Sequence, residues 1–211
     1  INVQSGICEI DGTQANNYDF SKVSESEIFA LDNEVEQAQK DAILKAKNSH
    51  NSVGGVALVN VKNAPIGLGE PLYFKLDSQI ANAMMGINAV KAVEIGDGIL
   101  ASKVKGYDNN DQIRKTGFKT NHSGGILGGI SNGDDINVKV YFKATPSIFI
   151  EQETIDTANN EVNCQLKGRH DPCVAVRGSV VAESMMALVL ADMVLLNMSS
   201  KMENVKKVYS K

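Results

Sequence analysis

Alternating apolar and polar positions predict several strands along the 211-residue chain. The clearest alternation lies at residues 135–143, where every second residue is apolar, and it is typical of a half-buried antiparallel strand. Residues 54–63 are rich in valine and apolar on both faces, which predicts a fully buried strand. Further strands are predicted at residues 1–10, 89–96, 147–155 and 161–168, the last two joined by the turn 157–160.

Apolar spacings of three and four predict the helices. Ser24 and Glu27 have the spacing of a capping box, and an amphipathic surface helix is expected to follow them and to end near residues 48–55. A second helix is predicted after Leu72, because its apolar residues recur on one face. These residues are Leu76, Ile80, Ala83, Met84 and Ile87.

The last predicted helix runs from about Val174 to Asn197 and is nearly all apolar. It carries Arg177, Glu183 and Asp192, and charges of this kind are expensive in lipid. We therefore expect a helix in the core of a soluble protein rather than a membrane span, and no membrane partner. A lysine-rich tail follows it.

The order of the elements bounds the fold class. A polar stretch rich in Gly and Asn, residues 97–125, has little periodicity and predicts a long loop. Strands and helices are mixed without regular βαβ alternation, which predicts an α+β fold. Residues 1–211 contain no repeat and no low-complexity linker, so we expect them to belong to a single domain.

Composition excludes some classes of function. The net charge of −4 argues against a general nucleic-acid binder, because phosphate backbones select basic surfaces. Cys8, Cys164 and Cys173 form a sparse, odd set, which is typical of reduced thiols in a cytoplasmic protein. No Cys or His pair has the spacing of metal ligands, so no metal site is predicted.

Two short motifs could approach an anion. Gly124–Gly125 and Gly128–Gly129 let backbone N–H groups come close to a ligand, but composition alone favours two tight turns between strands. The stretch "KATPS" ends the strand at 135–143 and offers one cation and two hydroxyls to a phosphate. The alternative is a strand exit that Pro146 ends.

The stretch "GRHDPC" places dense charge directly before the apolar helix. Arg169 and Asp171 would point to the same side of an extended segment. A structural alternative is an ion pair between them, with Asp171 as the helix N-cap and Pro172 at the first helical position. We expect His122 and His170 to be hydrogen-bonding neighbours rather than catalysts.

Four stretches together resemble the chorismate synthase family, and they occur in the family's order over nearly the whole chain. These stretches are "GEPLYFKLDSQIANAMMGINAVKAVEIGDG", "NHSGGILGGISNG", "KATPS" and "GRHDPCVAVRGSVVAESMMALVLAD". The resemblance implies a phosphate lyase of the shikimate pathway, which leads to the aromatic amino acids. Its reaction is the anti-1,4-elimination of phosphate from 5-enolpyruvylshikimate 3-phosphate to chorismate, with reduced FMN and no net redox change.

The family's motifs also imply roles for single residues here. The expected catalytic residue is Asp171, which matches a carboxylate near flavin N5 that is thought to help deprotonate it. The expected FMN contacts come from the helix–strand break, the glycine motif, the "KATPS" stretch and the charged loop. They are Asn88, Ala89, Gly128, Lys143, Ala144, Thr145, Pro146, Ser147 and Arg169. Whether NADPH also reduces the flavin on the protein is left open by these residues.

The implied fold is a β-α-β sandwich, with antiparallel sheets around a helical core, in a homotetramer. The family's amino-terminal part, with two catalytic histidine motifs and an arginine-rich stretch, has no match in this sequence. We therefore expect residues 1–211 to be the carboxy-terminal part of such an enzyme and to be inactive alone. A flavin-binding or structural module without catalysis is the alternative, and a general anion-binding domain is a third interpretation.

Overall fold

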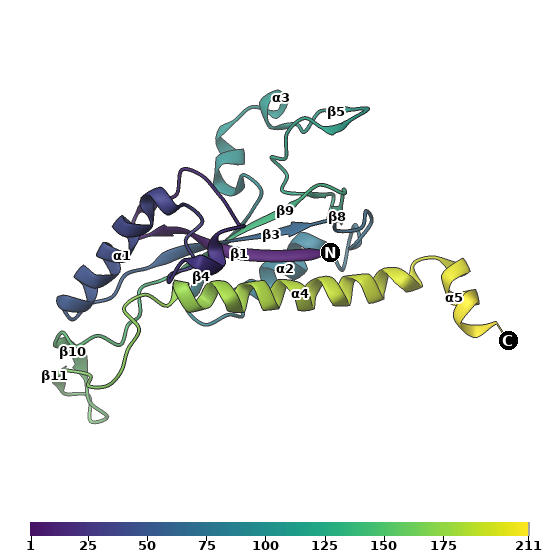
Figure 1. Ribbon diagram of the computed structural model, residues 1–211. Helices are drawn as coiled ribbons and strands as arrows, with labels where there is room; N and C mark the ends of the chain where they lie inside the picture. Colours follow the sequence, from purple (N-terminus) through teal and green to yellow (C-terminus); the bar gives the residue numbers. More distant parts are fainter. Residues whose placement is uncertain (211) are drawn as a thin grey trace.

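The computed structural model describes residues 1–210, and its centre is a five-stranded sheet in which every neighbouring pair is antiparallel (Figure 1). The strand order is β2-β1-β3-β9-β4. The strands are β1 (Asn2–Ile10), β2 (Thr13–Gln14), β3 (Gly55–Lys62), β9 (Ile136–Phe142) and β4 (Val90–Ile95). The sheet brings together segments from both halves of the described chain.

The predicted alternation at residues 135–143 is confirmed by β9, which lies between β3 and β4. Its residues Ile136, Val138, Val140 and Phe142 are buried, and the residues between them are half-buried. Strand β3 is buried from Gly55 to Val61, as its apolar run predicts. Strand β3, at the centre of the sheet, therefore carries the more continuous apolar sequence, because both of its faces are covered, whereas β9 buries one face fully and the other in part.

Helices α2 (Leu76–Met85) and α4 (Ala175–Ser199) form one layer against the sheet and contact each other. The helical face predicted after Leu72 is confirmed, since Leu76, Ile80 and Met84 are fully buried. The helix itself starts later than predicted. The buried side of α4 packs mainly on β1 and β3, and together these side chains form the largest core cluster.

The other face of the sheet is covered by residues 15–32 and by α1 (Asn33–Asn48). The capping box predicted at Ser24 and Glu27 is wrong, because Val23–Glu25 is only a short 3-10 turn, η1. The N-cap of α1 is Asp32, whose carboxylate accepts the backbone N–H of Glu34 at 3.0 Å. A capping residue must directly precede its helix. Tertiary packing places the start of α1 about two helical turns after the start that the sequence predicts.

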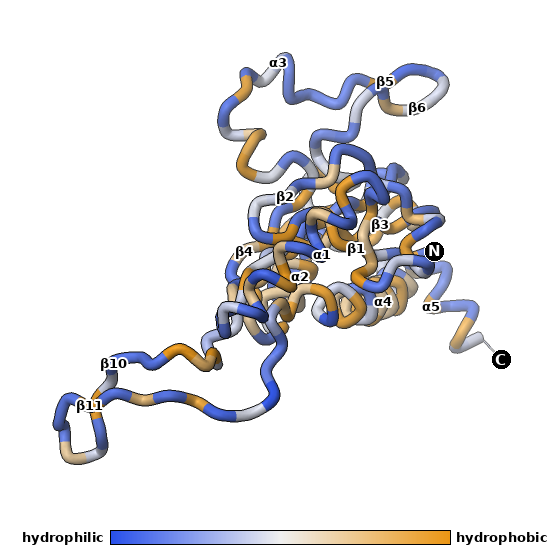
Figure 2. The backbone as a smooth tube through the Cα atoms, turned by 60° about the vertical axis from the view of Figure 1, so that its left-hand side comes forward, coloured by the Kyte–Doolittle hydropathy of each residue, from blue (hydrophilic) through white to orange (hydrophobic). Residues whose placement is uncertain are grey.

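The remaining elements leave the sheet as excursions, which are mostly hydrophilic in Figure 2. The long polar loop predicted at residues 97–125 is confirmed, because this segment contains only short helical turns and two-residue strands. It contains η2 (Gly98–Lys103), α3 (Gly106–Asn109), β5 (Ile113–Arg114) and β6 (Gly117–Phe118). Three further elements are the β7–β8 hairpin (Ile126–Leu127 and Ile130–Ser131), the β10–β11 hairpin (Gln152–Ile155 and Glu161–Cys164) and α5 (Met202–Tyr209).

Helix α4 is covered on one side only. Its outer side exposes large apolar residues within the part of the chain that the structure describes: Val180, Val181, Leu188, Leu195 and Met198. By length and composition α4 could also cross a membrane, and a third of its most apolar window is buried. The expected position of this helix in the core is met on one side only, because residues 1–210 supply one sheet for it to pack on.

The α+β class is confirmed by this mixture of antiparallel sheet and packed helices. The five-stranded sheet and the α2–α4 layer correspond to two of the three layers expected of a sandwich. Within residues 1–210 no sheet lies on the outer side of α4.

The close approach of α4 to the sheet depends on Gly178. A Cβ at this position would overlap the ring of Phe142, which is buried on β9. We expect Gly178→Ala to lower the free energy of unfolding by about 1–3 kcal/mol, the usual cost of overpacking. This loss should exceed the gain of about 1 kcal/mol that alanine brings to a helix interior. Urea unfolding monitored by circular dichroism measures the change.

Gly106→Ala is the matched control, since a Cβ at Gly106 in α3 would meet nothing within 4 Å. It should leave the unfolding midpoint unchanged or raise it slightly. An equal or higher midpoint for Gly178→Ala would show that the helix can move away from Phe142 without cost.

Candidate functional site

The end of β9 brings two of the motifs together. Directly after Phe142, the backbone N–H of Lys143 donates to the carbonyl of Ala89 at 2.9 Å. Ala89 has φ +71°, a left-handed conformation that is unfavourable for a residue with a Cβ. In this conformation the carbonyl of Ala89 points toward the residue that follows β9. The hydrogen bond to Lys143 then holds the break between α2 and β4 beside "KATPS".

The loop between α1 and β3 anchors the "KATPS" stretch from the other side. The hydroxyl of Ser52 donates to the carbonyl of Thr145 at 2.6 Å. The backbone N–H of Phe149 donates to the carbonyl of His50 at 3.1 Å. Sequence reasoning missed Ser52, and no local signal could have found it, because its partner lies 93 positions away.

The "GRHDPC" loop closes this region. The carbonyl of Pro172 accepts the backbone N–H of Val53 at 2.8 Å, which joins the loop to the start of β3. The ring of Phe149 lies 5.5 Å from that of His170 between ring centroids. A small cavity of about 30 Å³ lies among these segments, and Ser147 and Asp171 are among the residues that line it.

The structure corrects the expected role of Asp171 as a helix cap. Helix α4 begins at Ala175, its N-cap is Val174, and no side chain caps it. Asp171 lies four residues before the first helical residue, too far to act as the N-cap. Its carboxylate instead pairs with Arg177, at 3.2 Å between Oδ2 and Nη1, whereas Arg169 is exposed and forms no ion pair within residues 1–210.

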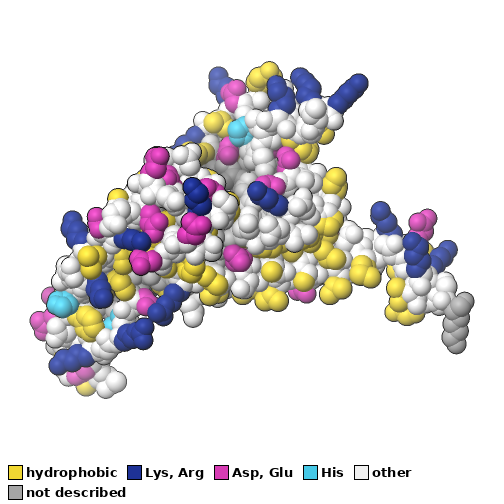
Figure 3. Space-filling model, viewed as in Figure 1, with side chains coloured by type: hydrophobic (Ala, Val, Ile, Leu, Met, Phe, Trp, Pro, Cys, Tyr) yellow, Lys and Arg dark blue, Asp and Glu magenta, His cyan; other side chains and the backbone are white. Residues whose placement is uncertain are grey.

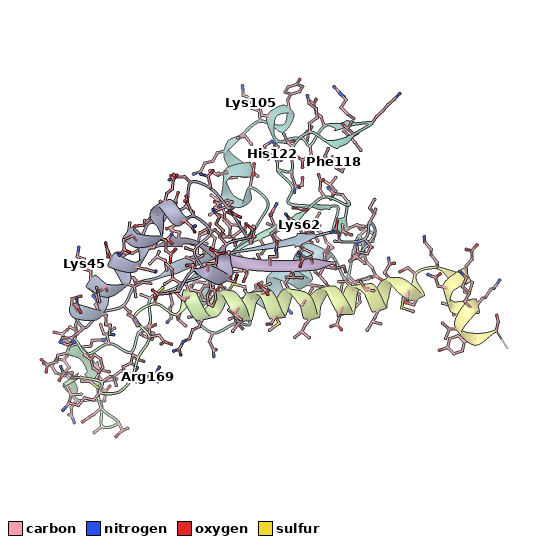
Figure 4. All side chains as sticks on the ribbon, in the orientation of Figure 1. Lys45, Lys62, Lys105, Phe118, His122 and Arg169 are labelled. Atoms are coloured by element: carbon pink, nitrogen blue, oxygen red, sulfur yellow. The ribbon has the colours of Figure 1, made fainter. Side chains whose placement is uncertain are left out.

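Two buried polar atoms in this region have no hydrogen-bond partner within the described chain. They are Oγ1 of Thr145 and Nε2 of His170. Unpaired buried polar atoms are costly, and each requires a specific explanation, such as a bound group. We call the region around them the Lys143 site, made of residues 88–89, 143–147 and 169–171 with the anchoring loop 50–53. Figure 4 shows Arg169 at this end of the molecule.

Gly128 lies outside the Lys143 site. It occupies the turn of the β7–β8 hairpin with φ +60°, and no atom lies within 4 Å of the position that a Cβ would take. The next residue, Gly129, accepts the backbone N–H of Leu76 at 2.8 Å, so this hairpin sits at the start of α2. Asn88 and Ala89 follow the end of the same helix, whose ten residues span about 15 Å.

The glycine motif is held in place by residues of the polar excursion. Asp111 accepts the backbone N–H groups of His122 at 2.7 Å and Ser123 at 2.9 Å. The ring Nδ1 of His122 lies 2.6 Å from a carboxylate oxygen of Asp97, which confirms His122 as a hydrogen-bonding neighbour. Sequence reasoning missed both aspartates, because each lies in a segment without periodicity.

The same motif borders an open cavity of about 410 Å³. Ser123 and Ile126 line it from the motif, and Asp77 and Ser78 line it from the first turn of α2. This open cavity and the Lys143 site, whose own cavity is only about 30 Å³, lie toward opposite ends of α2. Together they could receive an extended ligand or two neighbouring ligands.

Hydrogen bonding to the Asp111 carboxylate sets a pH dependence of stability. Burial raises its pKa, but the N–H groups of Ser123 and His122 and the hydroxyl of Thr120 outweigh burial, so the pKa lies below its ordinary value. A lowered pKa in the folded state stabilises the protein above the unfolded pKa of about 3.9, and this contribution is lost as the pH falls through the folded value.

We therefore expect Asp111→Asn to lower the free energy of unfolding at pH 7 by about 1–3 kcal/mol, because it removes charge-assisted bonds. The difference from the unsubstituted protein should shrink as the pH falls below about 4. Urea unfolding at a series of pH values measures it. Asp108→Asn, on the exposed α3, is the control and should change little. A difference that persists undiminished at low pH would contradict the electrostatic cause.

Comparisons with known proteins place the chain in a family. The family model described as chorismate synthase matches residues 1–195. A chorismate synthase of Aliarcobacter butzleri (strain RM4018) is 85% identical over all 211 residues, and one of Sulfurimonas denitrificans (strain ATCC 33889 / DSM 1251) is 63% identical over the same length.

A solved structure described as a crystal structure of chorismate synthase superposes with a TM-score of 0.77 at 30% sequence identity. The match covers 98% of this chain and 61% of that one. The chain spans 59% of the length of the two curated relatives named above. The family match over most of the chain, together with these relatives, shows that the chain belongs to the chorismate synthase family.

Proposed function

We propose that these residues form part of an enzyme that eliminates phosphate from 5-enolpyruvylshikimate 3-phosphate to give chorismate, with reduced FMN as cofactor. The observation that carries the proposal is the Lys143 site. Three motifs from distant parts of the chain meet there, around two buried polar atoms that lack partners, Thr145 Oγ1 and His170 Nε2.

The donors of the Lys143 site fit a flavin nucleotide. Lys143 offers an ammonium group that is exposed and forms no ion pair within residues 1–210, and Thr145 and Ser147 offer hydroxyls. An ammonium group and hydroxyls bind a phosphate or a polar ring edge by charge-assisted hydrogen bonds. Asn88 and Ala89 would contribute backbone groups, Ala144 and Pro146 would contribute contact surface, and Arg169 would add a second cation.

We include Gly128 in the proposed cofactor site because its hairpin lies at the start of α2, and the Lys143 site lies at the end of the same helix. The open space around Gly128 lets a flat group approach its backbone, and the N-terminal end of α2 beside it favours negative charge. A ligand that reaches from this end of the helix to the Lys143 site would contact all of the proposed residues.

The cationic residues of the Lys143 site would balance the negative charges of the substrate and the cofactor. Both the substrate and reduced FMN are anions, and bringing them together requires cations that are already in position. Figure 3 shows Lys and Arg side chains around the end of the molecule that carries the Lys143 site. Lys47 lines its cavity, and Lys143 and Arg169 are exposed beside it. Reduced FMN supplies the electron density that assists the departure of phosphate.

Asp171 is the proposed catalytic residue. It is half-buried at the cavity and held by Arg177, so its carboxylate has a defined position. We assign it the transfer of a proton at flavin N5. An ion pair with an exposed arginine orients a carboxylate without burying it, and a positioned carboxylate can serve as a general base.

The proposed activity belongs to the complete protein, since the chain spans 59% of the length of the first relative. The proposal includes a homotetramer in the cytoplasm. Support for a reducing compartment comes from the thiols, because Cys8, Cys164 and Cys173 are all free. The test is an anaerobic assay with reduced FMN and 5-enolpyruvylshikimate 3-phosphate, in which the complete protein should form chorismate and residues 1–211 alone should not.

Flavin binding without turnover by the complete protein would favour the alternative, a flavin-binding or structural module. If the complete protein neither binds FMN nor turns over, the enzyme and the flavin-binding module are both excluded, and a structural module remains. The assay therefore separates the two functions and does not depend on any substitution.

Lys143→Ala in the complete protein tests the cofactor site. Loss of one charge-assisted hydrogen bond costs about 1.5–3 kcal/mol, so the dissociation constant for FMN should rise by about one to two decades. Fluorescence titration measures it. Lys105→Ala removes an equally exposed lysine from the excursion at the other end of the molecule and should leave the affinity unchanged (Figure 4). Equal effects of the two substitutions would mean that Lys143 acts only through net charge.

Asp171→Asn tests the catalytic assignment. The substitution keeps the shape and removes the charge, and an exposed ion pair contributes at most about 1 kcal/mol, so thermal stability should change little. FMN should still bind, and turnover should fall at least about a hundredfold, as for the loss of an acid–base group.

Arg177→Gln is the matched control, because it breaks the same ion pair and leaves the Asp171 carboxylate in place. It should lower turnover much less than Asp171→Asn does, because the carboxylate itself remains. If both substitutions reduce turnover equally, Asp171 acts only by pairing with Arg177.

A further inference from the structure

The β10–β11 hairpin projects away from the sheet (Figure 1). All eight residues of its ladder are exposed, and its extensive contacts are only between its own two strands. An isolated two-stranded hairpin is marginally stable in water, and its free edges are templates for another strand. This hairpin therefore needs a partner.

The segment that contains β11 has one mainly apolar side, and Gln152 and Thr154 of β10 lie opposite it on the same face. Val162 and Leu166 alternate with Cys164 between them, so their side chains point to the same side. The register pairs Cys164 with Gln152, and its continuation places Leu166 opposite Ile150. Ile150, Val162 and Leu166 are each about 40% exposed. Alternation of this kind is typical of a strand that is part of a larger sheet.

The chain beyond β11 has free backbone groups. Residues 165–169 form no backbone–backbone hydrogen bond with any other part of residues 1–210. The side chain of Gln165 donates to the carbonyl of Phe149 at 2.6 Å, which keeps this segment beside the irregular residues that precede β10. The outer edge of residues 161–167 can therefore accept a strand along its whole length.

The sequence of this edge is self-complementary about Cys164. If β11 lies antiparallel to β11 of a second copy with the two-fold axis at Cys164, Glu161 faces Lys167 of the second copy. Val162 then faces Leu166 of the second copy, and the two Cys164 residues face each other. Directly opposite residues share a face of the sheet, and both opposite charges and apolar pairs stabilise it.

Other alignments lose these pairs. Moving the axis by one residue places either Leu166 against Asn160 or Val162 against Gly168. Pairing through β10 about Gln152 would place Glu151 against Glu153 of the second copy, and like charges opposite each other are destabilising. One edge and one register are therefore favoured.

We propose that β11 is a self-association surface, which pairs antiparallel with β11 of a second copy of this chain to give a four-stranded sheet in the order β10-β11-β11-β10. The pairing extends β11 to Lys167. It also orders the residues that lead directly into Arg169 and Asp171, and so links assembly to the Lys143 site. The surface follows from the hairpin alone and is independent of the proposed reaction.

Cys164 provides a reporter of the register. Opposite residues of an antiparallel pair have Cα atoms about 4.5–5.5 Å apart, within the range of a disulfide. Cys164 is exposed, whereas Cys8 and Cys173 are buried. Burial raises the pKa of the Cys8 thiol to about 12 and also raises that of Cys173, so both stay protonated and unreactive at neutral pH.

The test is oxidative cross-linking of the complete, unmodified protein by copper phenanthroline in air, read on a non-reducing gel. We expect a covalent dimer, and Cys164→Ser should abolish it. Glu161→Lys and Lys167→Glu should each weaken cross-linking by about tenfold or more, because two symmetry-related pairs change from attraction to repulsion. The double variant E161K/K167E should restore the yield. Glu153→Lys, the same charge change on the strand away from the proposed interface, is the control and should have no effect.

Two results would overturn the proposal. If the unsubstituted protein forms no dimer through Cys164, the hairpin pairs with something other than its own copy. If single charge reversals leave the yield unchanged, or the double variant does not recover it, the cross-link reports random collision. Neither result bears on turnover, so the proposed function is tested separately.

Discussion

Burial of β9 between β3 and β4 is the interaction on which the rest of this structure depends. Its apolar face packs toward the α2–α4 layer, and Gly178 lets α4 come within contact of Phe142. Because β9 is held on both edges, both of its ends have fixed positions. Lys143 emerges at one end and the glycine motif is attached at the other.

The proposed site uses this rigid strand as a support for loops. Hydrogen bonds from Ser52 and to Ala89 hold "KATPS", and the carbonyl of Pro172 ties the charged loop to the same place. Loops positioned by a buried scaffold commonly carry binding residues. Within residues 1–210, Thr145 Oγ1 and His170 Nε2 are buried beside these loops without a hydrogen-bond partner.

Two exposed regions of the described chain are uncovered, and they differ in kind. The outer side of α4 is broadly apolar, while the β10–β11 hairpin offers a backbone edge with ordered charge. The first can be covered by any apolar layer of suitable shape. The second selects its partner by register, because a shift of one residue changes every pair.

Periodicity in the sequence by itself determined β3, β9, the buried face of α2 and the β10–β11 hairpin, because each is set by neighbours a few residues apart. The resemblance of four motifs pointed to the family. The start of α1 at Asp32 was not predictable in this way, nor was the pairing of Asp171 with Arg177 in place of a helix cap. Contacts such as Ser52 with Thr145 join residues 93 positions apart, and only the tertiary structure decides them, since local spacing carries no information about distant partners.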